Sequence, residues 1–199
     1  MLPALAAGFL AAAEMNRTSV KLSSACTVDE YRKHEQSKDR ERIAVFIDER
    51  FVERYITPVE TSTKRHGFAT MAVSCLMVEA LESFWRGWPN SKSRSELAFC
   101  SFFQRTPQLA VFQGHVPAFY QHVRCGILHQ AETTGGWRIR ATGPLFDARA
   151  KTINANAFLS VLRSAVNDYA TQLRAADWSS DVWTNCRKKM DSICANCVP

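Results

Sequence analysis

Two side chains near the middle of the chain have the types and spacing needed to act on a phosphodiester. Arg124 and His129 stand five positions apart in the stretch AFYQHVRCGILHQAETTGGWRIR, residues 118–140. A guanidinium keeps its positive charge and binds phosphate through paired hydrogen bonds, whereas an imidazole titrates near neutral pH and can move a proton. This pair is therefore the first candidate for chemistry.

The stretch that carries the pair is predicted to be a helix from Pro117 to about Glu132. Proline suits a first helical turn, where its missing N–H needs no partner, and Thr134-Gly135-Gly136 ends the helix. Apolar residues at helical spacing predict which side faces the core; they are Phe119, Tyr120, Val123 and Ile127.

On an ideal helix Arg124 and His129 lie about 140° apart, so they do not share a face. They can still reach one phosphate if Gly126 lets the helix deform or if the arginine is extended. A third option is that two chains pair across a two-fold axis and each contributes one group, which predicts a homodimer.

The elements that must position this helix are mostly helical as well. Apolar periodicity predicts an all-α bundle of about six helices, with a small β-hairpin after the motif helix. Residues 71–77 are apolar on nearly all sides, which predicts a central buried helix, and residues 155–175 form a strong amphipathic helix. Ser93 and Glu96 fit a capping box at the start of another helix.

The chain divides into residues 1–42, an N-terminal arm or helix that is partly disordered, and a bundle domain over residues 43–199. Residues 28–42 are highly charged with mixed sign, which is typical of a solvated helix face or a fraying arm. Residues 1–13 are apolar like the centre of a signal peptide, but no Lys or Arg precedes them. Met15 is an alternative natural start.

Composition indicates a globular protein that can bind anions. The chain has 199 residues and a net charge of +6, and residues 67–199 carry most of the excess positive charge. Its seven cysteines lie mostly in apolar runs, which is usual in a reducing compartment and predicts a cytoplasmic location. No run approaches the ~20 apolar residues that a membrane span needs.

The segment RCGILHQ, with the layout around it over residues 43–175, resembles the HEPN superfamily (higher eukaryotes and prokaryotes nucleotide-binding domains). Those proteins are helical bundles with an Arg-x4–6-His motif, often dimeric, and many are metal-independent endoribonucleases. The matching residues here are Arg124 and His129. The chain departs from the common pattern at Cys125, where Asn, Asp or His usually follows the arginine.

The resemblance implies a mechanism that needs no metal or cofactor. The 2′-OH of RNA attacks the adjacent phosphate, with His129 as acid or base and Arg124 stabilising the charge on the phosphate oxygens. Arg138 and Arg140, on the predicted hairpin, are expected to guide the RNA backbone. We expect His122 and Cys125 to support the pair, and a regulatory protein partner to control it.

Other interpretations of the same residues remain open. Arg124 can simply pair with a carboxylate such as Glu79 or Glu82, which makes the protein a non-catalytic nucleotide-binding or protein-interaction module. Exposed tryptophans would then mark an interface; they are Trp85, Trp88, Trp178 and Trp183. Zinc has two weaker candidate sites, the stripe His122, Cys125 and His129, and the C-terminal group Cys186, Cys194 and Cys197.

Overall fold

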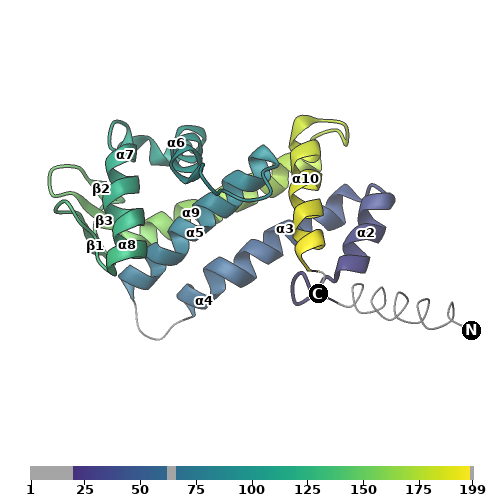
Figure 1. The fold of residues 1–199 in the computed structure, drawn as a ribbon, viewed down its shortest axis with the longest axis horizontal. Helices are drawn as coiled ribbons and strands as arrows, with labels where there is room; N and C mark the ends of the chain where they lie inside the picture. Colours follow the sequence, from purple (N-terminus) through teal and green to yellow (C-terminus); the bar gives the residue numbers. More distant parts are fainter. Residues whose placement is uncertain (1–19, 62–65, 198–199) are drawn as a thin grey trace, which may run out of the picture.

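The structure, a computed structural model, describes residues 20–61 and 66–197 (Figure 1). Its longer helices are α2 (Val28–Gln36), α3 (Arg40–Phe51), α5 (Gly67–Arg86), α6 (Ser95–Arg105), α9 (Ala155–Ala175) and α10 (Asp181–Asn196). Shorter ones are the π-helix η1 (Val52–Ile56), α4 (Thr57–Glu60), the 3-10 helix η2 (Pro107–Phe112), α7 (Val116–Phe119), the π-helix η3 (Tyr120–Arg124) and α8 (Cys125–Gln130). The predicted helical architecture is therefore confirmed, and a small sheet accompanies it.

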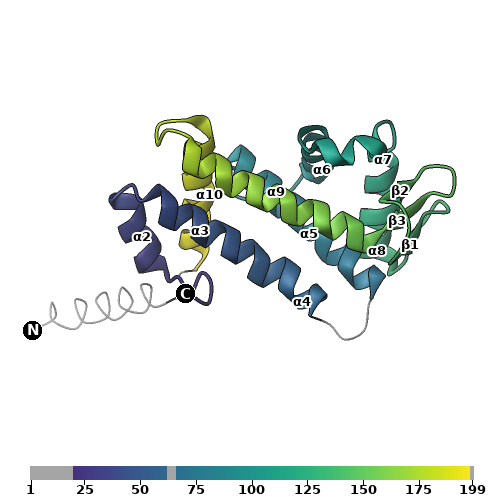
Figure 2. The same cartoon turned by 180° about the vertical axis from the view of Figure 1, so that it is seen from behind.

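Three long helices form the centre of the molecule. The extension of α3 through η1 and α4 runs beside α9, and α9 packs against α5 (Figure 2). Helix α5 is long and apolar enough to cross a membrane, but 61% of its most apolar stretch is buried inside the protein. That burial is typical of the core helix of a water-soluble protein. The predicted amphipathic helix over residues 155–175 is confirmed as α9.

The remaining elements gather at the two ends of these central helices. Helices α6, α7 and α8 and the small sheet lie at one end, and α2 and α10 lie at the other (Figure 1). The predicted arm contributes Leu22, Cys26 and Tyr31 to the same hydrophobic core as the bundle, so no break in the core marks residue 43. The apolar residues 1–13 and Met15 lie outside the described residues.

The predicted hairpin is only partly correct, because the sheet has three short strands. They are β1 (Arg138–Arg140), β2 (Phe146–Asp147) and β3 (Thr152–Asn154), in the order β1-β3-β2. Strand β2 pairs antiparallel with β3, whereas β1 pairs parallel with β3, with Ile139 opposite Ile153. Strands β1 and β3 therefore run in the same direction. The loop after β1 carries the chain to the far edge of the sheet, where β2 runs in the opposite direction before the chain returns as β3.

The expected capping box on α6 is wrong. Ser93 has a left-handed φ of 62° and lies outside the helix, which begins at Ser95 with no side-chain cap from Arg94. The hydroxyls of Ser91 and Ser95 instead donate to the Glu79 carboxylate, at 2.5 and 2.9 Å. The serine hydroxyls near the start of α6 therefore bind a carboxylate of α5, and no serine caps α6 as the sequence had predicted.

Candidate functional site

The predicted motif helix runs without a break over residues 116–130 as α7, η3 and α8. Pro117 lies in its first turn, as expected, and Ala131 ends it with a left-handed φ of 54°. The π-helical turn η3 ends at Arg124, and such wide turns are frequent at functional sites. A π-helical turn contains one residue more than an α-helical turn, and the apolar periodicity of the sequence did not predict this insertion.

Arg124 is held by an ion pair inside the protein. Its Nη2 and Nε donate to Oε1 of Glu79 at 2.7 and 2.8 Å, and the two side chains are only 16% and 10% exposed. The guanidinium also lies 5.6 Å from the centre of the Tyr120 ring. Burial opposes the positive charge, but the bonds to Glu79 outweigh it and raise the pKa of Arg124. Of the two carboxylates considered from the sequence, Glu79 is the partner.

His129 lies in the last turn of α8, exposed to solvent. Among the described residues its ring makes no hydrogen bond or ion pair, so it is free to bind a substrate. On an ideal α-helix positions 124 and 129 lie about 140° apart, and here Arg124 is the last residue of the wider turn η3 while His129 belongs to α8. Neither side chain lines any of the four main cavities in the described part of the protein. None of these four cavities therefore contains both groups within one chain.

The two expected supporting residues differ in what they do. Nδ1 of His122 lies 2.9 Å from Oγ1 of Thr134, and a Cβ on Gly135 would lie 2.7 Å from the His122 ring. His122 thus fastens the loop after α8 against the motif helix. Cys125 is partly buried and carries a free thiol.

Gly126 has a packing role rather than the hinge role considered from the sequence. A Cβ at this position would lie 2.6 Å from the carbonyl oxygen of Glu132 and 3.3 Å from Cα of Thr133. The chain after α8 therefore folds back directly over Gly126, and only glycine leaves room for it.

The two zinc alternatives have no support in the geometry. Within residues 20–61 and 66–197 no group of three or more His, Cys, Asp or Glu side chains is arranged to hold a metal ion. In the C-terminal group, Cys186 is fully buried, and burial raises its pKa to about 12, far from the thiolate that zinc requires.

Arg138 and Arg140 lie on one face of β1 and are both exposed, while Ile139 between them points inward. They line an open groove of about 560 Å³, together with Phe68 at the start of α5 and Glu132 beyond α8. Neither arginine forms an ion pair with any described residue. Trp137 stacks on Phe146 at 5.4 Å beneath the strand and fixes its position.

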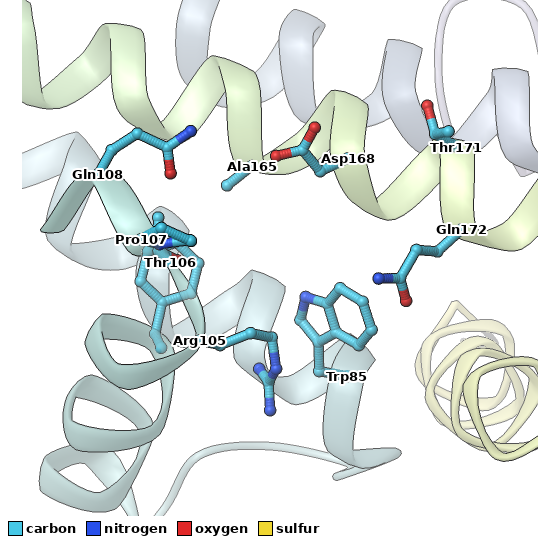
Figure 3. A pocket seen from close by; sticks show the side chains of 10 residues that line it. Trp85, Arg105, Thr106, Pro107, Gln108, Ala165, Asp168, Thr171 and Gln172 are labelled. Carbon is cyan, nitrogen blue, oxygen red and sulfur yellow. The ribbon is translucent and has the colours of Figure 1, made fainter. Parts of the chain in front are cut away.

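A separate cavity of about 380 Å³ lies between the end of α5, the junction of α6 with η2, and α9 (Figure 3). Asp168 and Gln108 point into it from opposite sides, and the indole of Trp85 forms one wall. Arg105 lies 4.8 Å from the centre of the Trp85 ring and, with Arg86, pairs with the buried Glu82. Sequence reasoning missed this cavity, whose residues come from three distant segments.

The exposed tryptophan interface considered from the sequence is not formed as expected. Trp183 is fully buried and donates from Nε1 to the carbonyl of Leu173, and Trp178 packs against it at 4.6 Å. Trp85 and Trp88 are half-buried. Large aromatic side chains here mostly complete the core.

The chain matches no family model, no curated protein and no solved structure.

Proposed function

We propose that this protein is a HEPN-like, metal-independent endoribonuclease whose active site is completed in a homodimer. One observation carries the proposal: Glu79 holds Arg124 in a defined place, while His129 of α8 is exposed and has no hydrogen-bond or ion-pair partner among the described residues. Because an ideal helix directs the two positions about 140° apart, we assign the acid or base beside Arg124 to His129 of a second chain.

The surface around this pair favours such a dimer. Leu76 lies one helical turn before Glu79, Leu128 lies one turn after Arg124, and each is 56% exposed. Residues three or four positions apart on a helix are neighbours, so the ion pair is flanked by two exposed leucines. Exposed apolar side chains that gather in this way mark interaction surfaces.

The chemistry follows from what each side chain can do. Arg124 keeps donor N–H groups beyond those that bind Glu79, and these stabilise the negative charge that develops on phosphate oxygens. His129 takes the proton from the 2′-OH or gives one to the leaving 5′-oxygen. The products are a 2′,3′-cyclic phosphate and a 5′-hydroxyl, and the reaction requires no cofactor.

The groove beside β1 supplies the substrate-binding surface in this proposal. Arg138 and Arg140 carry unpaired positive charge toward the RNA backbone, and Phe68 offers a ring on which a base can stack. The groove begins at Glu132, directly after the end of α8 that carries His129. A single strand in the groove is thus led toward the imidazole.

The test is RNA cleavage in EDTA by wild type, His129→Ala and Gln130→Ala. Gln130 is the matched control, because it is exposed at the same end of α8. We expect wild type and Gln130→Ala to leave cyclic-phosphate ends, and His129→Ala to be at least ~100-fold slower, the scale of general acid–base catalysis. Equal cleavage by folded His129→Ala would contradict the assignment.

A second candidate function is a non-catalytic module that binds RNA or a nucleotide. The observation in its favour is the same ion pair, because an arginine held between Glu79 and Tyr120 is well satisfied without any substrate. RNA that binds the groove of Arg138 and Arg140 but is never cut, with the protein monomeric throughout, would establish this function instead.

We further propose a cytoplasmic location and control by a partner protein. All seven cysteines are free thiols, as suits a reducing compartment. A partner that covers Leu76 and Leu128 would block the dimer and so silence the nuclease.

A further inference from the structure

A small cavity away from the motif helix brings three basic side chains together. Arg50 of α3 and Arg54 of η1 meet Lys189 of α10 around a space of about 170 Å³. Its remaining lining comes from Phe51, Tyr55, Ala80, Phe84 and Ile193, so no acidic residue borders it. Phe51 and Phe84 are each 2% exposed and form a firm apolar base.

None of the three positive charges is neutralised by a carboxylate of the described chain. Arg50 and Arg54 both donate to the carbonyl oxygen of Leu22, the latter at 2.8 Å, and Lys189 donates to that of Pro89 at 2.8 Å. Glu53, adjacent to Arg54 in the sequence, turns instead to the N–H of Ser24 at 2.8 Å. The bonds from Ser24 lower the pKa of Glu53, and the charges of Arg54 and Arg50 lower it further, so this one carboxylate only partly offsets the three positive charges at the cavity.

The pKa shifts of Arg50 and Lys189 agree with an excess of positive charge at this cavity. Burial lowers the pKa of Arg50, and the neighbouring charge of Arg54 lowers it further. Burial also lowers the pKa of Lys189, and the charge of Arg50 adds to the effect. Partly desolvated like charges repel each other, and an anion placed among them removes that repulsion.

We propose that this cavity binds a single phosphoryl group, either free phosphate or the terminal phosphate of a nucleotide chain. Phosphate esters carry close to two negative charges at pH 7, which suits a cavity lined by three basic side chains. A space of 170 Å³ holds one tetrahedral oxyanion, but it is smaller than the ~300 Å³ at which pockets for larger ligands begin. The two arginines donate in-plane N–H groups, and Lys189 supplies a compact charge.

The test is calorimetric titration of the full chain with inorganic phosphate at constant ionic strength. Lys189→Gln removes the charge but keeps an N–H donor for Pro89, so it should fold. Lys188→Gln is the matched control, because Lys188 is the exposed neighbour that does not line the cavity. We expect wild type and Lys188→Gln to bind with a dissociation constant at or below ~1 mM, and Lys189→Gln to bind at least ~10-fold more weakly.

A second pair of titrations separates the two sources of the phosphoryl group. The probes are one DNA oligonucleotide with a 5′-phosphate and the same oligonucleotide with a 5′-hydroxyl, because DNA lacks the 2′-OH that the proposed cleavage requires. A preference for the phosphorylated form that disappears in Lys189→Gln assigns the cavity to a chain end, and phosphate binding without such a preference assigns it to the free ion. No saturable phosphate binding by wild type, or equal binding by Lys189→Gln, overturns the proposal.

Discussion

At the scale of single residues, the carboxylates of α5 explain most of what surrounds the motif. Glu79 joins Arg124 to Ser91 and Ser95, and so ties the motif helix to α6. An acidic residue in a helix as apolar as α5 signals a buried partner, which is why pairing with Glu79 or Glu82 could be predicted. The choice between them could not, because it depends on how α5 and η3 pack.

Removal of the Glu79 carboxylate should destabilise the protein. Glu79→Ala leaves the Arg124 guanidinium, 16% exposed, without its counter-charge. We expect the free energy of unfolding to fall by about 3 kcal/mol, on the scale of a broken buried pair. Glu96→Ala, at an exposed site on α6, should change it by less than ~0.5 kcal/mol. Urea unfolding curves measure both, and equal small effects would contradict the role of the pair.

Buried thiols should make the protein less stable in alkaline solution. Burial raises the pKa of Cys186 to about 12 and that of Cys26 and Cys194 to about 11, from the ordinary 9.0. The native state keeps these protons while the unfolded chain loses them above pH 9. Stability is therefore complete below pH 9 and falls as the pH rises from 9 toward 11.

The expected slope is about 1.4 kcal/mol per pH unit for each fully protected thiol. Thermal unfolding between pH 8 and 10.5 measures it, and Cys186→Ala should show a shallower decline than wild type. A wild-type unfolding midpoint that stays constant up to pH 10.5 would contradict the burial of these thiols.

At the scale of elements, helices were predicted better than strands. Each long amphipathic helix has a period that the sequence repeats several times, as in α9, where buried side chains recur from Phe158 to Leu173. Strand β2 has two residues and β1 has three, too few to show a period. The parallel pairing of β1 with β3 depends on the path of the connecting loop, which no local pattern specifies.

Gly126 should be intolerant of any side chain. In Gly126→Ala the new methyl would lie 2.6 Å from the carbonyl oxygen of Glu132, and that contact is with backbone that cannot simply rotate away. We expect a loss of about 1–3 kcal/mol of unfolding free energy, the usual cost of overpacking. Wild-type stability in this variant, measured by urea unfolding, would show that the loop after α8 does not fold over the motif helix.

At the scale of the whole molecule, the central helices separate two charged regions. The motif helix and the groove of Arg138 and Arg140 lie at one end, with α2 and α10 at the other (Figure 2). The net charge of +6 permitted an anionic partner but did not indicate where it would bind. Arg54 and Lys189 are 135 positions apart, so only the packing of both η1 and α10 against α5 places them at one cavity.

The most direct measurement of the central claim is cleavage by mixed subunits. Arg124→Lys keeps a cation for Glu79 but loses paired phosphate binding, and His129→Ala removes the acid or base. Each variant alone should be inactive. If each site combines Arg124 of one chain with His129 of the other, the heterodimer has one intact site, and a one-to-one mixture recovers about a quarter of wild-type activity. A mixture as inactive as its components, beside an active wild type, would contradict a site shared between two chains.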